Sequence, residues 1–439
     1  MGGFSELRNS PQYGFALPSK CGGDRRRSGH ILLHVSLSLR RFYHGRLPHF
    51  RWLWRWVRLY RKILRALPIA KIPISSKYFG RPKGFYQTTR EYLNSPAGQS
   101  AGNLSREIYP AETVRFALPI PLDGGEVHWK FAEHQVKEIP PACVFELRDA
   151  RFWGRYGGSI VTADDRLLAD LSPDVLGLEN HRIFAALKLP RCRRLHGTVA
   201  VLSTAEAAGN YWHWTFDLLP RLHLLEKAGF TPANVDFYLV NHRGLPFQME
   251  TLAEAGLAPG KIIRTNGRTH IEADRMVVSS LKPGQFHLAG WTCRYLHDLA
   301  PKAVKNKKRR LFVGRGDAAF RRWSNEDDVF NFLRPRGFER ISCEELSVAE
   351  QRQVFSEAEV VVGAHGAALA NIIYCRPEAT FVEIFPSGYV DASIWPAASY
   401  LRLKHYYILG EGSSHDANAR KQDIFLAARK FPLLVASEA

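Results

Sequence analysis

Hydrophobic positions recur at helical spacing over residues 209–229, and polar side chains with chemical capability interrupt this pattern. Asn210 is a favoured helix N-cap, so we expect a helix to begin there. His213, Asp217 and Arg221 follow at intervals of four, which would place all three on one face of the helix. An imidazole, a carboxylate and a guanidinium in register indicate a functional site rather than packing alone.

The adjoining face carries Leu218, Leu222 and Leu225, and we expect it to pack into a core. Pro220 cannot donate the usual helical hydrogen bond, which predicts a kink or two short helices. The kink weakens the placement of Arg221 beside the other two polar residues.

Strand and helix patterns alternate along the rest of the chain. The first half predicts strands at 127–131, 143–147, 150–156, 159–162, 199–203, 237–240, 262–264 and 275–278, with helices at 246–255 and 287–299. The second half predicts strands at 310–315, 338–342, 359–362 and 380–385, with helices at 324–333, 347–358 and up to residue 374. Ser324 is the expected N-cap of the first of these helices, and Ser347 with Glu350 forms a capping box for the second. Strands separated by helices of about ten residues predict an α/β protein with a parallel, doubly wound sheet.

Basic charge is concentrated at the N-terminus of this 439-residue chain, which has a formal net charge of +19. Residues 1–90 contain 19 of the 61 Lys and Arg and two of the 42 acidic residues, a balance of +17. The remaining residues contain 42 basic (61 − 19) and 40 acidic (42 − 2) side chains, a balance of +2. A nucleic-acid-binding surface needs basic patches on the folded domains, so the near-neutral body argues against that function.

Residues 1–29 lack periodicity and are expected to be disordered. Residues 50–67 predict a basic amphipathic helix with flanking tryptophans, which suits an anionic membrane surface; the alternative is a helix docked on the body. No apolar run reaches the roughly 18 residues of a membrane-spanning helix, and no small-residue cleavage site follows residues 31–39. The six cysteines are scattered, without CxxC or metal-ligand spacing, and favour a reducing compartment.

The turn after the strand at 359–362 has the composition of an anion-binding site. Gly363, Gly366 and Ala367 would let backbone amides approach a diphosphate, and His365 could donate a hydrogen bond to it. Arg315 ends the strand at 310–315 and points to the same crevice. The alternatives are a tight strand-to-helix turn and a solvated arginine.

Glu383 lies inside an apolar strand, where a carboxylate is costly unless it has a partner. The hydroxyl groups of a ribose would be suitable partners.

Together, the segments YWHWTFDLLPRL (211–222), RLFVGR (310–315), SNEDDVFNFLRPRGFE (324–339) and the block 346–386 resemble glycosyltransferase family 61. The resemblance covers roughly residues 149–407. It implies a GT-B architecture, in which two Rossmann-like doubly wound domains face a cleft, here with a basic N-terminal extension. It also implies an inverting transfer from a UDP-sugar held mainly by the second domain, with no required metal and no further cofactor.

The expected domains are a basic extension at 1–102, an acceptor-side α/β domain at 103–301, a nucleotide-sugar-binding Rossmann-like domain at 302–415 and a C-terminal crossing helix at 416–439. The charged connector at 302–310 marks the boundary between the second and third of these.

By resemblance, Asp217 is the expected general base for the acceptor hydroxyl. His213 is the second candidate, because imidazole exchanges protons near neutral pH, and it would otherwise orient Asp217 or bind the acceptor. The alternative is an Asp and His that only satisfy each other. Arg315, His365 and the amides around Gly366 would stabilise the departing UDP.

Three further assignments follow from the resemblance. Asn371 would hold the loop or the uracil, with a structural role as the alternative. Trp212 and Trp214 would stack on sugar faces, although aromatic residues at a helix start often belong to the core. Arg221 would contact the acceptor.

The expected partners are therefore a UDP-sugar, a glycan or glycolipid acceptor and an anionic membrane surface at residues 50–67, without nucleic acid. A basic N-terminus and the absence of secretory disulfides favour a cytoplasmic bacterial enzyme of the capsular-polysaccharide type, on the inner face of the plasma membrane, over one in the Golgi lumen. The competing functions are a catalytically inactive glycan-binding relative and a basic nucleic-acid-binding protein.

Overall fold

The structure is a computed structural model. It describes residues 56, 59, 63, 75–78, 80–280, 288–301, 308–316, 321–411, 422–427 and 430–431. Contacts divide the chain into two compact units, Met1–Ile63 and Leu64–Ala439. None of the helices in the described residues is both long enough and apolar enough to cross a membrane.

In the first unit, Trp56, Leu59 and Ile63 are helical and exposed. These three residues agree with the helix expected over the basic segment 50–67. The other residues of that segment, and the segment 1–29, lie outside the described residues.

The first sheet of the second unit has a parallel centre. The strands that follow one another across this sheet are β1 (Gly84–Tyr86), β9 (Arg166–Leu168), β8 (Ser159–Val161), β7 (Arg151–Trp153), β13 (His270–Ser279), β10 (Arg193–Val201), β11 (Phe237–Val240) and β12 (Ile262–Arg264). A further strand, β6 (Ala142–Arg148), pairs with β13 and with β2 (Leu104–Tyr109). Strands β13, β10, β11 and β12 are parallel, and β6 and β7 run antiparallel to β13. Helix α8 (Pro246–Glu254) connects β11 to β12, so this half contains the expected βαβ units.

The second sheet is parallel throughout its described strands. In spatial order these are β15 (Phe338–Ile341), β14 (Arg309–Val313), β16 (Ala358–Ala364), β17 (Thr380–Phe385), β18 (Lys404–Leu409) and β4 (Ile120–Pro121). Helices α10 (Glu326–Leu333), α11 (Val348–Ser356), α12 (Trp395–Tyr400) and the 3₁₀-helix η9 (Ala367–Tyr374) connect its strands. The chain adds β15 on one side of β14 and then β16 on the other, so the order of strands reverses between β14 and β16. The carboxyl ends of strands at such a switch point are where α/β proteins bind ligands.

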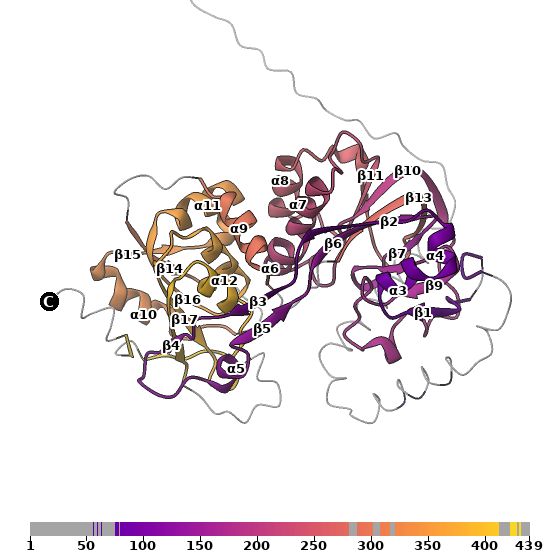
Figure 1. The fold of residues 1–439 in the computed structure, drawn as a ribbon. Helices are drawn as coiled ribbons and strands as arrows, with labels where there is room; N and C mark the ends of the chain where they lie inside the picture. The colour runs from indigo at the N-terminus through magenta and orange to yellow at the C-terminus, as the bar shows by residue number, and fades with distance from the viewer. Residues whose placement is uncertain are drawn as a thin grey trace, which may run out of the picture. The chain divides into compact units, whose positions relative to one another are not determined.

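The short strand β4 comes from the first half of the chain but pairs with β18 of the second sheet. In Figure 1 the purple segment labelled β4 lies at the edge of this sheet, whose other strands come from the orange and yellow part of the chain. The largest hydrophobic core also joins the two halves, since it contains Trp214 and Leu218 together with Leu369 and Ile372. The boundary expected at 302 is therefore crossed by both a strand pairing and a shared core.

Three expected elements differ from the structure. Residues 129–132 form helix α5 (Trp129–Ala132) instead of part of a strand, because the His128 side chain accepts a hydrogen bond from the Lys130 amide and caps a helical turn. The helix that ends at Tyr374 is a 3₁₀-helix. Residues 422–427 of the expected C-terminal helix are not helical, and they form isolated bridges to Trp323 and Glu411.

The bridging segment also explains a wrong cap prediction. Asn325, not Ser324, precedes α10, and neither side chain caps the helix. The Ser324 hydroxyl donates to the Ile424 carbonyl at 3.0 Å, and the Asn325 side chain bonds both backbone groups of Leu426. The capping box of Ser347 and Glu350 is confirmed.

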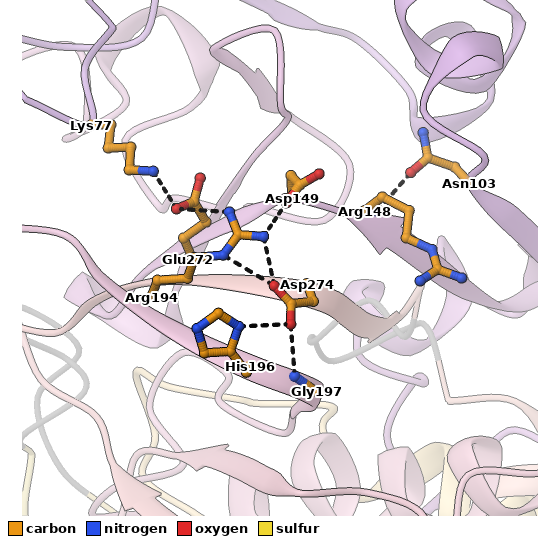
Figure 2. A network of polar contacts seen from close by, with 9 residues as sticks. All are labelled: Lys77, Asn103, Arg148, Asp149, Arg194, His196, Gly197, Glu272 and Asp274. Atoms are coloured by element: carbon orange, nitrogen blue, oxygen red, sulfur yellow. Dashed lines mark hydrogen bonds and ion pairs between the residues drawn. The ribbon is translucent and has the colours of Figure 1, made fainter.

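A charged network lies where β10 is irregular beside β13 (Figure 2). The Arg194 guanidinium bonds Asp274 at 2.6 Å and Asp149 at 2.7 Å, and the Gly197 amide donates to Asp274 at 3.0 Å. The Gly197 amide, followed by Arg194, lowers the pKa of Asp274 to about 2. Asp274 is thus an ionised acceptor that joins the two strands at the bulge.

Candidate active site

The helix that begins at Asn210 is interrupted by a π-helical turn. It consists of α6 (Tyr211–His213), the π-helix η5 (Trp214–Leu218) and α7 (Leu219–Lys227). The Asn210 side chain accepts hydrogen bonds from the amides of Trp212 and His213, which confirms the expected N-cap. Pro220 explains the interruption, because it lacks an N–H for the Phe216 carbonyl and its ring would clash with that carbonyl. Such π-turns occur frequently at functional sites.

His213 and Asp217 form a hydrogen-bonded pair across this turn. Nδ1 of His213 lies 2.6 Å from Oδ2 of Asp217. The Asp217 side chain is only 4% exposed, whereas the His213 side chain is 25% exposed. The imidazole is therefore the accessible member of the pair, and its Nε2 is the nitrogen that Asp217 does not bind.

Arg221 supports this pair from inside the protein. Its Nε donates to the Asp217 carbonyl oxygen at 2.9 Å, and its Nη1 lies 3.3 Å from the Ser279 hydroxyl at the end of β13. Burial lowers the pKa of Arg221 to about 10, and the charge of Asp217 opposes this effect. The structure thus connects Arg221 to the helix and the sheet, and does not bring it to the central pocket described below.

A second histidine and carboxylate pair lies at the carboxyl ends of β16 and β17. Nδ1 of His365 lies 2.7 Å from Oε1 of Glu383, and His405 Nε2 of β18 lies 3.2 Å from Oε2, at ion-pair distance. Glu383 is completely buried. Burial opposes its ionisation most strongly, but the hydrogen bonds and charges of His365 and His405 together lower its pKa. Glu383 therefore contacts two imidazoles, and ribose hydroxyls are not needed as its partners.

One pocket, here called the central pocket, contains a histidine from each pair. It has a volume of about 600 Å³, open to solvent, and its lining includes Asn210, Trp212, His213, Arg321, His365, Gly366, Ala367, Tyr389, Asp391, Ser393 and Ile394. His213 comes from the helix after β10, whereas His365 follows the switch-point strand β16. The π-turn and the second sheet thus bring together residues that are more than a hundred positions apart in the sequence.

Five residues of this lining were missed by the sequence analysis: Arg321, Tyr389, Asp391, Ser393 and Ile394. The Tyr389 hydroxyl donates to Asp391 at 2.6 Å, and Nε2 of His365 lies 4.0 Å from the same carboxylate. Burial opposes the ionisation of Asp391 most strongly, but the charge of His365 and the hydrogen bonds from Tyr389 and Ser393 lower its pKa. The available signal was the position of residues 386–394 directly after the carboxyl end of a parallel strand.

The two tryptophans of the helix have different surroundings. Trp214 is completely buried, and its indole N–H donates to the Thr251 hydroxyl at 2.9 Å, so it belongs to the core. Trp212 is 6% exposed and lines the central pocket, and its ring makes an edge-to-face contact with the ring of His213. Trp212 is therefore the one of these two tryptophans that is placed to contact a ligand.

The remaining expected donor residues lie beside the pocket or behind it. Nη1 of Arg315 donates to the His365 carbonyl at 3.2 Å, and burial lowers the pKa of Arg315 to about 10. Gly363 lies in β16, against Leu369. Asn371 is completely buried and accepts a hydrogen bond from the Tyr211 hydroxyl at 2.8 Å, as expected for its structural alternative.

Among the described residues, no group of three or more His, Cys, Asp or Glu side chains is arranged to hold a metal ion.

The fold and pocket define an α/β protein with a pocket at the switch point of a parallel sheet. Residues 211–382 match the family model of glycosyltransferase 61, and this match supports that family for the chain. The matched region contains His213, Asp217 and His365, and it ends one residue before Glu383. No curated protein matches the sequence.

Proposed function

We propose that the protein is an inverting glycosyltransferase that moves a sugar from a UDP-sugar to a hydroxyl of a glycan or lipid-linked oligosaccharide. One observation carries the proposal: His213 and His365, which both belong to the residues that match family 61, line one pocket, and each is held by a buried carboxylate. A GT-B arrangement of two Rossmann-like halves is the proposed frame, and it is supported by the two sheets with parallel strands.

In the proposed reaction, His213 Nε2 takes the proton from the acceptor hydroxyl while that oxygen attacks the anomeric carbon of the donor. The bond between this carbon and UDP breaks on the opposite face, which inverts the configuration. Asp217 accepts the Nδ1–H hydrogen bond and would stabilise the imidazolium that forms. The proposal gives the role of base to His213 rather than Asp217, because the enclosed carboxylate already binds the imidazole.

The departing diphosphate needs positive charge and hydrogen-bond donors. Arg321 and the first turn of η9, at Gly366 and Ala367, line the pocket and can supply both. His365 Nε2 would donate to the same group, with its ring held by Glu383 and its backbone by Arg315. These donors would act without a metal, and this is part of the proposal.

The proposal includes an anionic membrane surface as a partner of residues 50–67, on the inner face of a bacterial plasma membrane. The basic amphipathic pattern supports this partner, as do the exposed helical residues Trp56, Leu59 and Ile63. The test is co-sedimentation of the full chain with phosphatidylglycerol vesicles and with neutral phosphatidylcholine vesicles. We expect binding to the anionic vesicles, with loss of binding when Arg55 and Arg58 are replaced by Glu. Equal sedimentation with both vesicles would contradict this partner.

A donor screen tests the catalytic proposal. Thermal shift and UDP release would be measured with UDP-GlcNAc, UDP-Xyl, UDP-Glc and UDP-Gal, with and without EDTA, on the wild type and on His213→Ala. We expect one UDP-sugar to stabilise both proteins, and acceptor-dependent turnover in the wild type alone, with a product of inverted anomeric configuration. Stabilisation by none of the donors would refute the proposed donor class, and turnover that stops with EDTA would refute metal independence.

A further inference from the structure

A second pocket, here called the polar pocket, lies at the carboxyl ends of β10, β11 and β12. It has a volume of about 920 Å³, open to solvent, and it is lined by the turn at 154–157, by residues 206 and 208–210, and by residues that follow β11 and β12. Asn210 lines both the polar pocket and the central pocket, so the two adjoin at the start of the helix that carries His213. A ligand in the polar pocket would thus lie next to the proposed base.

Two arginines give the polar pocket its charge. Arg155 and Arg243 are exposed, and neither has a carboxylate at ion-pair distance within the part of the chain that the structure describes. Glu206 is the only acidic residue in the lining, and it accepts a hydrogen bond from the Tyr156 hydroxyl at 3.1 Å. The lining therefore has a net formal charge of +1, from two arginines and one glutamate.

The backbone conformation of the lining fixes the positions of Arg243, Tyr156 and Glu206. A Cβ atom added at Gly209 would lie 2.8 Å from Cζ of Arg243, so the guanidinium packs directly against the bare backbone. Tyr156 and Glu206, which bond each other, both have a positive φ, of 54° and 66°. Non-glycine residues held in this region often occur at functional sites, where surrounding contacts offset the strain.

We propose that the polar pocket binds an anionic acceptor, a glycan whose sugar next to the reacting unit bears a carboxylate or a phosphate. The assignment to an acceptor rests on the proposed function, since it depends on His213 as the base. The planar guanidinium groups of Arg155 and Arg243 match the geometry of either anion, and no described carboxylate competes for them. The proposed donor-side groups Arg315 and His365 follow strands β14 and β16 of the other sheet, which leaves this pocket to the second substrate.

The test is calorimetric titration of the full chain, saturated with UDP, with three probes: trigalacturonic acid, its methyl ester and a sugar phosphate. We expect the wild type to bind the acid or the sugar phosphate, and the ester at least about tenfold more weakly. The Arg155→Gln, Arg243→Gln double variant should lose about tenfold in affinity for the anionic probe and retain its affinity for the ester. Arg268→Gln is the matched control, because Arg268 is exposed and lies nearby in the sequence but outside the lining.

The outcomes distinguish a uronate from a phosphate ligand, and the anionic-acceptor proposal from the proposed glycosyltransferase function. Preference for the acid identifies a uronate and preference for the sugar phosphate identifies a phosphate, and either supports the anionic pocket. Equal binding of acid and ester, no binding of either anion, or an equal loss in Arg268→Gln would overturn it. The Arg243→Lys variant should keep part of the affinity, because it retains the charge without the bidentate geometry; a loss as large as in Arg243→Gln would contradict recognition by charge. If an anion binds but no UDP-sugar stabilises the protein, the acceptor assignment is refuted together with the proposed function.

Discussion

The substitution Asp217→Asn tests the proposed roles of His213 as the base and of Asp217 as the carboxylate that orients its ring. Asn has nearly the same size as Asp, so the change removes a charge and one acceptor from an enclosed position, 4% exposed, without opening a cavity. At 2.6 Å from Nδ1, the amide can instead present an N–H to the ring. The ring would then carry its proton on Nε2, the nitrogen that must accept the proton of the acceptor hydroxyl.

The expected loss of activity has two parts. A hydrogen bond to a charged group contributes roughly 1.5–3 kcal/mol, and its loss from the transition state corresponds to a rate decrease of about 10- to 150-fold. The wrong tautomer adds to this, since the equivalent change in a Ser-His-Asp triad lowers kcat by about 10⁴. We therefore expect a decrease in kcat of about 10²–10⁴ with little change in KM for the donor. The Asp217 charge also supports the buried Arg221, so the free energy of unfolding should fall by about 1–3 kcal/mol.

The assay is the initial rate of UDP release with the donor and acceptor selected by the screen, at a temperature where circular dichroism shows both proteins folded. Asp328→Asn, an exposed charge on α10, is the control for nonspecific effects of charge. His213→Ala should lose at least as much activity as Asp217→Asn, and the double variant should lose no more than the larger single loss, because the two residues act as a unit. Activity that survives in His213→Ala but not in Asp217→Asn would reverse the two roles and refute our reasoning.

Three further outcomes are expected. Asn371→Leu should destabilise the fold by about 2–3 kcal/mol, because it removes the acceptor of the Tyr211 hydroxyl and the donor to the Gln351 side chain. It should leave the thermal shift with UDP unchanged; an unchanged stability with a reduced thermal shift would indicate a contact with uracil. Asp391→Asn should weaken binding of the UDP-sugar but not of UDP, as measured by calorimetry, whereas equal weakening of both would contradict a contact with the sugar. Since the folded-state pKa of Glu383 is lowered from 4.5, the stability that its ionised form contributes is present above that pH and is lost as the pH falls through the folded value. Between pH 6 and 3 the melting temperature should therefore fall more steeply in the wild type than in Glu383→Gln. Parallel plots of melting temperature against pH would argue against this ionised carboxylate.

Much of the α/β pattern was predictable, because the buried parallel strands are short apolar runs bounded by caps and turns. The predicted strand at 380–385 has the bounds of β17, and the capping box at Ser347 marked the start of α11. Two predictions were wrong for different reasons. At residues 127–131 a local cap, in which the His128 side chain accepts a hydrogen bond from the Lys130 amide, forms a turn of helix. At residues 422–427 a tertiary contact, the bridge between Ile424 and Trp323, holds the segment extended. The pairing of β4 with β18 joins segments almost three hundred residues apart, which no local pattern reports.

The candidate site was predictable where it depends on spacing within one element. His213 and Asp217 are four residues apart in a helix, and His365 follows the carboxyl end of a buried strand. Which residue of a histidine and carboxylate pair faces the pocket depends on how the chain buries each side chain. The sequence therefore could not show that Glu383 is buried between His365 and His405. The polar pocket was missed for the same reason, since its lining comes from several separate turns.

The charges of the central pocket determine how a UDP-sugar can lie in it. The pKa of Asp391 is lowered despite its burial, so this carboxylate is ionised at neutral pH and would repel a diphosphate. Arg321 and the first turn of η9 at Gly366 attract one. The diphosphate should therefore lie nearer to Arg321, Gly366 and His365 Nε2 than to Asp391, with the sugar hydroxyls donating to Asp391. In that orientation Asp391 would select the sugar, and Arg321 with Gly366 would retain the UDP. Loss of the Asp391 charge should therefore lower the affinity for the UDP-sugar and leave the affinity for UDP unchanged.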